Sequence, residues 1–139
     1  MRYFSYPATV EEYEPGDFIV RFIDVPEAIA FGRTSEEAIG NAPDALRAAI
    51  EHYIEREPDV PAPRPAKAGE VSIALEPDVA ARAILRRAMN EQGLTNVALA
   101  RRMNRDEKAV RRILSGRRAS FTLTLEALKA LGLRPTLGV

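Results

Sequence analysis

The feature that most constrains the fold of this chain is a proline-rich segment near its middle. Residues 58–69 read PDVPAPRPAKAG and contain four prolines without any apolar periodicity. Proline fixes φ and favours the extended polyproline II conformation, so a semi-rigid spacer is expected here. We interpret the segment as a linker between a module at residues 1–57 and a second module at residues 70–139. The alternative is a long surface loop inside one domain.

The regions on either side of this segment carry opposite net charges. Residues 1–69 contain 7 Lys and Arg against 13 Asp and Glu, a net charge of −6. Residues 70–139 contain 13 Lys and Arg against 7 Asp and Glu, a net charge of +6. This inversion favours two modules with different partners, and the basic module is the candidate for binding nucleic acid.

The composition excludes several classes of protein. A chain of 139 residues with 46% apolar and 29% charged residues has room for one ordinary folded domain or two small ones. It has no apolar run near the roughly 20 residues of a membrane span, and its start does not resemble a secretory signal, so we expect a cytoplasmic protein. There is no cysteine and His52 is the single histidine, so no metal site, cofactor or thiol chemistry is expected.

The first module is predicted to begin with three strands. Residues 2–12 and 18–23 are rich in aromatic and β-branched side chains, which suits strands. The intervening Glu14-Pro15-Gly16-Asp17 has the chemistry of a tight turn, so the two strands form a hairpin. After a break at Asp24-Val25-Pro26, residues 28–32 can form the third strand.

A helix is expected to complete this module. Thr34 and Glu37 form a capping-box pattern at its start, and Pro43 should bend or interrupt it. Its apolar stripe consists of Ile39, Ala42, Leu46, Ala49, Ile50 and Tyr53. The prediction is therefore a β-β-β-α module with the helix on one face of an antiparallel sheet.

The second module is predicted to be mainly helical, with short flanking strands. A strand at residues 70–75 precedes a helix that opens at Pro77 and ends near Gln92. Thr95 caps a helix at residues 96–103, Asp106 caps one at residues 107–114, and Thr122 or Thr124 starts a fourth. Residues 71–75 and 133–139 are β-prone and would be unpaired edges in a monomer, so we expect them to join in a small sheet that supports a dimer.

Two of these helices have the spacing of a helix-turn-helix. Val97, Ala100 and Met103 point inward on the first helix, and Asn104-Arg105 stands at the turn. Asn tolerates the left-handed backbone conformation that such a turn often requires. The second helix exposes Glu107, Lys108, Arg111 and Arg112. Three of these four are cationic, which suits a helix that lies in a major groove. The alternative is a helical bundle with a solvated cationic face.

This segment resembles the XRE, or lambda-repressor-like, family of DNA-binding domains. The residues that carry the resemblance are Leu94-Thr95, Leu99–Met103, Val110, Ile113-Leu114, Gly116, Leu125, Leu128 and Leu131-Gly132. It implies base readout by Glu107, Lys108 and Arg112. It implies phosphate contacts by Thr95, Asn96, Arg111 and Arg117. Arg118 is a further predicted phosphate contact, because it follows the carboxyl-terminal end of the second helix together with Arg117. Glu107 departs from this pattern, because an acid near DNA costs affinity unless it pairs with arginine or accepts from cytosine.

The first module resembles the HicB antitoxin family. The resemblance rests on residues 18–28, FIVRFIDVPEA, on Gly32 and on residues 34–38, TSEEA. It implies a partial ribonuclease-H-like domain that binds a HicA-type ribonuclease toxin, followed by a domain that represses the operon. We therefore predict an α+β antitoxin and autorepressor that acts as a dimer, with tetramers left open. An acidic module can also be steered to a cationic RNA-binding toxin.

Four residues of the acidic module are predicted to bind the toxin: Asp24, Pro26, Glu27 and Phe31. One rival hypothesis is an XRE-family repressor whose first module senses another ligand or protein. The other is a nuclease, for which the available acids are Asp17, Asp24, Glu27 and Glu36. Most of these acids belong to turns or a helix cap, where acids are common for local reasons, so no catalytic residue is predicted.

Overall fold

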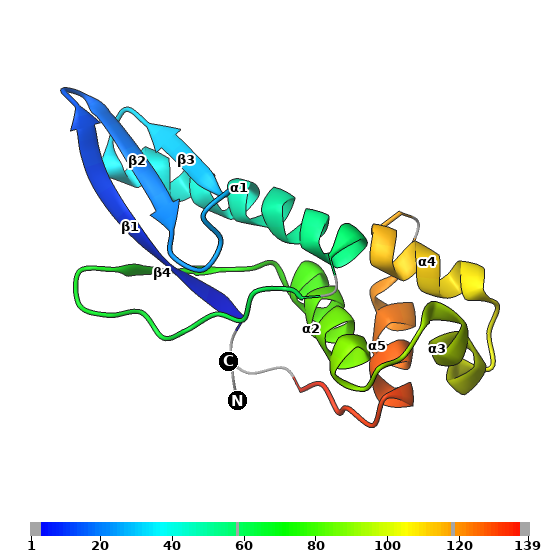
Figure 1. Ribbon diagram of the computed structural model, residues 1–139. Helices are drawn as coiled ribbons and strands as arrows, with labels where there is room; N and C mark the ends of the chain where they lie inside the picture. The colour runs from blue at the N-terminus through cyan, green and yellow to red at the C-terminus, as the bar shows by residue number, and fades with distance from the viewer. Residues whose placement is uncertain (1–3, 58, 118, 137–139) are drawn as a thin grey trace. The chain divides into compact units, whose positions relative to one another are not determined.

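The computed structural model describes residues 4–57, 59–117 and 119–136. It contains a four-stranded antiparallel sheet and five helices, so the prediction of an α+β protein is confirmed (Figure 1). The strands are β1 (Ser5–Glu14), β2 (Asp17–Phe22), β3 (Ile29–Gly32) and β4 (Val71–Ala74). The helices are α1 (Ser35–Arg56), α2 (Pro77–Glu91), α3 (Asn96–Met103), α4 (Glu107–Ser115) and α5 (Phe121–Ala130).

The chain divides into two compact units. A sheet unit consists of Arg2–Ile50 and Pro61–Glu76, and a helical unit consists mainly of Glu51–Val60 and Pro77–Val139. Helix α1 contributes residues to both units. The boundaries between the units therefore differ from the linker at residues 58–69 that the sequence suggested.

The sheet has the order β3-β2-β1-β4. Strands β1 and β2 form the expected hairpin, in which Ala8 pairs with Phe22 and Val10 with Val20. Gly16 in its turn has a φ of 82°, which glycine adopts without steric cost. Residues of β1, β2 and β3 alternate between two faces, as the twofold side-chain period of strands requires.

One face of the sheet contributes most of its buried side chains to the core of the sheet unit. Ala8, Val20, Phe22 and Ala30 are all buried on this face. Figure 1 shows α1 running along the sheet, and α1 buries Ala38, Ala42, Leu46 and Ile50 at helical spacing. The predicted β-β-β-α order is therefore present. The expected interruption at Pro43 is absent, since α1 is one continuous helix.

The proline-rich segment packs on the sheet unit. The Tyr6 hydroxyl donates a hydrogen bond to the carbonyl of Pro61 over 2.6 Å, and the Arg64 amide donates one to the Asp24 carboxylate over 3.3 Å. The chain then returns as β4, where Ile73 pairs with Tyr6. The expectation that residues 71–75 form an unpaired edge of the second module is therefore wrong. Strand β1 has backbone groups on the side away from β2, and β4 supplies partners for them.

The helical unit follows the local signals in the sequence. Helix α2 starts at Pro77, and α3 and α4 are capped by Thr95 and Asp106 as predicted. Helix α5 starts at Phe121 with Ser120 as its cap, rather than at Thr122 or Thr124. Residues 133–136 do not form the expected strand, and residues 137–139 lie outside the described part of the chain.

Candidate nucleic-acid interface and acidic sheet face

The α3–α4 pair is built by three short-range contacts. The Thr95 hydroxyl accepts a hydrogen bond from the Ala98 amide over 3.1 Å, which caps α3. Asn104 then takes the left-handed conformation, with φ 54° and ψ 46°, and reverses the chain. The Asp106 carboxylate accepts from the Lys108 amide over 2.9 Å and caps α4. Thr95, Asn104 and Asp106 each form a hydrogen bond with a backbone group that has no partner inside its helix. These bonds stabilise a tight turn between α3 and α4.

Helix α4 has one apolar and one cationic side. Ala109, Val110, Ile113 and Leu114 are buried on the apolar side. Lys108, Arg111 and Arg112 are exposed and line one shallow hollow, together with Asp106 and Ala109. The structure therefore brings together two of the predicted base-reading residues, Lys108 and Arg112.

Glu107 and Arg111 form an ion pair on the surface of α4. An Nη2 atom of Arg111 donates to Oε1 of Glu107 over 3.1 Å, four residues apart on the helix. This pairing supplies the arginine partner that an acid near DNA would require. It also occupies part of the Arg111 guanidinium. Among the described residues, Lys108 and Arg112 take part in no such ion pair.

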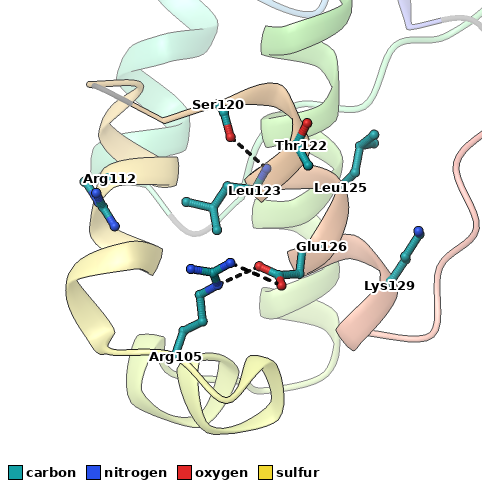
Figure 2. Close-up of a pocket in the computed structure, with 8 residues that line it drawn as sticks. All are labelled: Arg105, Arg112, Ser120, Thr122, Leu123, Leu125, Glu126 and Lys129. Atoms are coloured by element: carbon teal, nitrogen blue, oxygen red, sulfur yellow. Dashed lines mark hydrogen bonds and ion pairs between the residues drawn. The ribbon is translucent and has the colours of Figure 1, made fainter.

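A second groove lies where α4 faces α5 (Figure 2). It has a volume of about 550 Å³, and Arg105, Arg112, Ser120, Thr122, Leu123, Leu125, Glu126 and Lys129 line it. Nε of Arg105 donates to Oε2 of Glu126 over 2.7 Å, which joins the turn before α4 to α5. Sequence reasoning did not single out Arg105 as a contributor to this surface. Its position in the turn was the available signal, but its partner is 21 residues away.

The predicted phosphate-contacting residues are spread over several elements. Thr95 and Asn96 stand at the amino-terminal end of α3, where Thr95 already serves as the cap. Arg117 follows the end of α4 and is exposed, and its amide donates to the Ser115 hydroxyl. Arg118 lies outside the described residues. Of the described phosphate candidates, Arg111 lines the hollow on α4, whereas Thr95, Asn96 and Arg117 do not.

Part of the sheet face opposite α1 is exposed to solvent, although Ile19 on this face is buried. The register places Glu11 beside Ile19 and Phe31, and Thr9 beside Arg21 and Ile29. On this face Ile29 and Phe31 are exposed, although both are large and apolar. Phe31 is 53% exposed, and its ring meets that of Tyr13, which is 51% exposed, edge-on at 5.9 Å. An exposed cluster of this kind marks a candidate surface for binding another protein.

Two acidic residues and one arginine line a hollow beside the Tyr13–Phe31 pair. A hollow of about 280 Å³ is lined by Tyr13, Asp17, Phe31, Gly32, Arg33 and Glu37. Tyr13 lies within the irregularity in the β1–β2 register, between Glu12 and Glu14. Sequence reasoning missed Tyr13, Asp17 and Glu37 at this site. For Tyr13 the reason is that a bulge changes the direction of side chains in a way that strict alternation does not predict.

The other predicted toxin-binding residues lie in the loop between β2 and β3. Pro26 and Glu27 are exposed there. Asp24 is half-buried, and its carboxylate accepts from the Arg64 amide. None of these three lines the hollow beside Phe31. Asp24 therefore has a structural partner in the proline-rich segment, whereas Phe31 belongs to the exposed aromatic pair.

An ion pair between Arg64 and Glu70 stabilises the end of the proline-rich segment. Two nitrogens of Arg64 donate to the two carboxylate oxygens of Glu70, each over 2.9 Å, and the Lys67 amide donates to the same carboxylate over 2.8 Å. The hydrogen bond from Arg64, followed by that from Lys67, lowers the pKa of Glu70 to about 2. The same pairing raises the pKa of Arg64. Glu70 is thus ionised at any physiological pH and closes the loop before β4.

The acids considered for a nuclease site do not assemble into one. Within the described residues, there is no group of three or more His, Cys, Asp or Glu side chains that could hold a metal ion. Asp24 instead contacts the proline-rich segment, and Asp17 lines the aromatic hollow. In the same part of the chain, no helix is long and apolar enough to cross a membrane.

Comparisons with known proteins agree over most of the chain. A sequence model described as "HicB_like antitoxin of bacterial toxin-antitoxin system" matches residues 5–84. Antitoxin HicB 1 of Photorhabdus laumondii subsp. laumondii is 36% identical over 135 residues, covering 96% of this chain and 86% of the relative. Antitoxin HicB of Escherichia coli (strain K12) is 32% identical over 128 residues, covering 91% and 93%. The model match includes the whole sheet unit from Ser5 onward, while the α3–α4 pair lies beyond it.

Proposed function

Because this chain belongs to the HicB-like antitoxin family of bacterial toxin–antitoxin systems, we propose that it has two activities. It neutralises a HicA-type ribonuclease toxin through its sheet unit, and it represses its own operon by binding operator DNA through its helical unit. The partial ribonuclease-H-like fold of the sheet unit, the XRE-like helix-turn-helix of α3 and α4, and the cytoplasmic location belong to the same proposal.

The charge of the two units supports this division of labour. The sheet unit contains 6 Lys and Arg against 11 Asp and Glu, and the helical unit contains 14 against 9. The net charges are therefore −5 and +5. A negative unit suits a toxin that must itself hold RNA, and a positive unit suits the phosphate backbone of DNA.

The cationic side of α4 is the observation that carries the DNA-binding activity. Its exposed Lys108 and Arg112 lie one turn apart on a helix that follows a tight, capped turn. A guanidinium can donate two hydrogen bonds to the O6 and N7 atoms of guanine, which distinguishes base pairs in the major groove. The proposal assigns base readout to Lys108, Arg112 and Glu107. It assigns phosphate contacts to Thr95, Asn96, Arg111, Arg117 and Arg118.

The open face of the sheet supports the toxin-binding activity. Tyr13 and Phe31 form an exposed aromatic pair, and such residues supply much of the energy at protein interfaces. Asp17 and Glu37 line the same hollow and would complement a basic toxin. Asp24, Pro26 and Glu27 remain proposed as further contacts, from the loop between β2 and β3.

Operator binding is proposed to require a homodimer. A single helix pair contacts only a few base pairs, whereas two copies on half-sites one helical turn apart bind more tightly. Strand β4 pairs with β1 of the same chain, so residues 71–75 do not form the small sheet with residues 133–139 on which the sequence-based dimer prediction rested. Light scattering of the full chain, with and without operator DNA, measures the number of copies.

The test separates the two activities with two single substitutions in the full chain. The toxin in this test is a HicA-type ribonuclease, co-expressed with the antitoxin. Phe31→Ala should abolish toxin neutralisation and leave DNA binding intact, whereas Arg112→Ala should do the reverse. Phe121→Ala is the matched control for the first, since Phe121 is a 48%-exposed phenylalanine of the helical unit. A loss of both activities in either variant, or of neither, contradicts the proposed division.

A further inference from the structure

Arg82 of α2 is a buried charge that the proposed activities do not use. Only 5% of its surface is exposed, and Arg82 and Thr124 are the buried polar or charged residues among those described. Arginine is rarely buried unless its guanidinium is paired. The role of Arg82 therefore depends on what surrounds its guanidinium.

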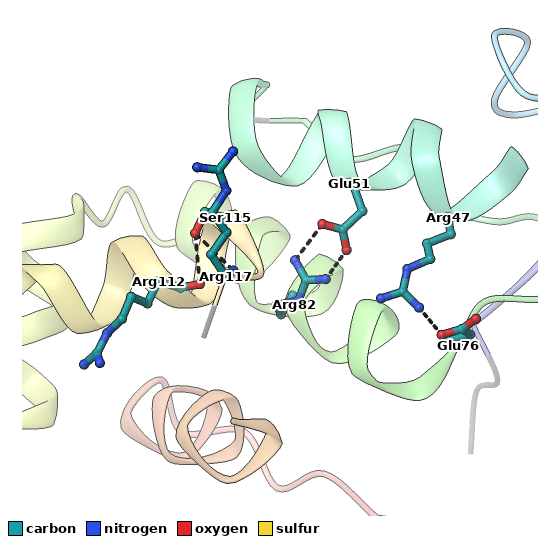
Figure 3. A network of polar contacts seen from close by, with 7 residues as sticks. All are labelled: Arg47, Glu51, Glu76, Arg82, Arg112, Ser115 and Arg117. Carbon is teal, nitrogen blue, oxygen red and sulfur yellow. Dashed lines mark hydrogen bonds and ion pairs between the residues drawn. The ribbon is translucent and has the colours of Figure 1, made fainter. Parts of the chain in front are cut away.

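Glu51 of α1 supplies the opposite charge. Nη1 of Arg82 donates to Oε2 of Glu51 over 3.1 Å, and Nη2 donates to Oε1 (Figure 3). Both residues belong to the helical unit, although α1 begins in the sheet unit. The two-pronged contact fixes the plane of the guanidinium, which a single hydrogen bond would leave free to rotate.

The guanidinium also lies against the end of α4. Gly116 ends α4 in the left-handed conformation with φ 72°. A Cβ atom placed on Gly116 would lie 3.0, 3.1 and 3.2 Å from Nη1, Cζ and Nη2 of Arg82, and these are its three nearest atoms. Arg82 therefore occupies the space that a side chain at Gly116 would need.

The contact between Arg82 and the carboxyl end of α4 is electrostatically favourable, and it lies close to two of the proposed DNA-binding arginines. The carboxyl end of a helix carries a partial negative charge, so a buried cation there stabilises it. Arg112 is in the last turn of α4, and Arg117 follows Gly116 directly. Any movement of this helix end would displace both arginines from their places against DNA.

We propose that Arg82, held by Glu51, is a positioning residue for operator binding, which fixes the carboxyl end of α4 without touching DNA. The proposal rests on the DNA-binding function above. It predicts that the pair matters for operator affinity in addition to any contribution to stability.

The first experiment replaces both charges at once. A buried ion pair replaced by apolar residues of similar size is often neutral or stabilising, so Glu51→Leu combined with Arg82→Met should fold. The matched control is Arg87→Met with Glu91→Leu, which removes a more exposed ion pair on the same helix. The probe is a duplex selected from random sequences by the wild-type protein, compared with its scrambled counterpart in gel-shift titrations.

The double replacement at Glu51 and Arg82 should weaken binding to the selected duplex by about two- to thirtyfold, as expected for residues that act indirectly. Binding to the scrambled duplex should change little, and thermal unfolding should stay near that of the wild type. The control pair should change neither.

The second experiment tests the contact with α4 without removing a charge. Gly116→Ala places a methyl group against the guanidinium, and it also strains a positive φ. Gly132→Ala is the matched control, because Gly132 follows the end of α5 with φ 80° and has no atom within 4 Å of its added Cβ. Gly116→Ala should reduce operator affinity, measured against the active protein fraction, while Gly132→Ala should not.

Three outcomes distinguish a positioning role of Arg82 from a purely structural one and from a failure of the DNA-binding proposal. Selective loss of operator affinity in both test variants, with both controls unchanged, supports the inference. Wild-type affinity in the folded Glu51→Leu/Arg82→Met variant overturns it and leaves the proposed function standing. A wild-type protein that prefers no duplex over scrambled DNA refutes the proposed DNA-binding function, and this inference with it.

Discussion

Replacing Arg112 by alanine is expected to weaken binding to operator DNA selectively. The side chain is exposed on α4 one turn after Lys108, and among the described residues it forms no ion pair. It is therefore free to make a two-pronged contact with guanine, which contributes about 1–3 kcal/mol of discrimination. The operator affinity should fall by about 5- to 150-fold, since 1.4 kcal/mol corresponds to a factor of ten.

The same substitution should leave the fold unchanged. The Arg112 carbonyl accepts a hydrogen bond from the Ser115 hydroxyl, and this main-chain contact survives replacement by alanine. Exposed substitutions of this kind usually change the free energy of unfolding by less than about 0.5 kcal/mol. Thermal unfolding of wild type and variant then shows whether the loss of affinity reflects binding alone.

Gel-shift titrations on operator and scrambled duplexes, at two salt concentrations, measure the effect. Arg117→Ala serves as the comparison, because a phosphate contact contributes to binding of every sequence. It should weaken binding to both duplexes alike and make the salt dependence shallower by about one unit. Equal losses of affinity on both duplexes for Arg112→Ala would mean that Arg112 contacts DNA phosphates and not bases. The proposed orientation of α4 in the major groove would then be wrong.

Three further perturbations test the sheet unit. Gly32→Ala should destabilise it by about 1–3 kcal/mol or more in chemical denaturation, because the added Cβ would lie 2.3 Å from a backbone nitrogen of α1. Glu70 has its pKa lowered to about 2 by Arg64, so its contribution to stability is complete above pH 4.5 and is lost as the pH falls toward 2. The difference in Tm between wild type and Glu70→Gln should therefore shrink over that range. A constant difference would show that the Arg64–Glu70 ion pair does not stabilise the fold. Phe31→Ala should weaken toxin binding in calorimetry by at least about 2 kcal/mol, and an unchanged affinity would remove the aromatic pair from the interface.

Local chemistry was sufficient to predict much of the helical unit. Thr95 and Asp106 were predicted as caps from their residue type and their position before an apolar periodic segment, and both side chains accept the expected backbone hydrogen bond. Asn104 was predicted at the turn because it tolerates a left-handed backbone, and it has a φ of 54°. These features depend on residues two to four positions apart, so the sequence contains all the partners.

Pairings across long stretches of chain were less predictable. The sequence identified residues 71–75 as a strand but assigned them to the wrong module, because β-propensity does not specify the partner strand. The proline-rich segment was expected to separate two modules, and it instead packs on the sheet through Tyr6 and Asp24. Composition predicted an extended segment here, but the contacts that hold it come from residues 40 and 55 positions away.

In the candidate sites too, local features were predictable from the sequence, whereas long-range pairings were not. By itself the sequence determined the HicB resemblance, the opposite charges of the two halves, and the cationic side of α4, because each follows from residue type and short-range spacing. Only the tertiary structure paired Glu51 with Arg82, Arg105 with Glu126, and Tyr13 with Phe31. Such partners are chosen by the free energy of the whole fold, in which a buried charge or an exposed ring is placed by elements that are remote in the chain.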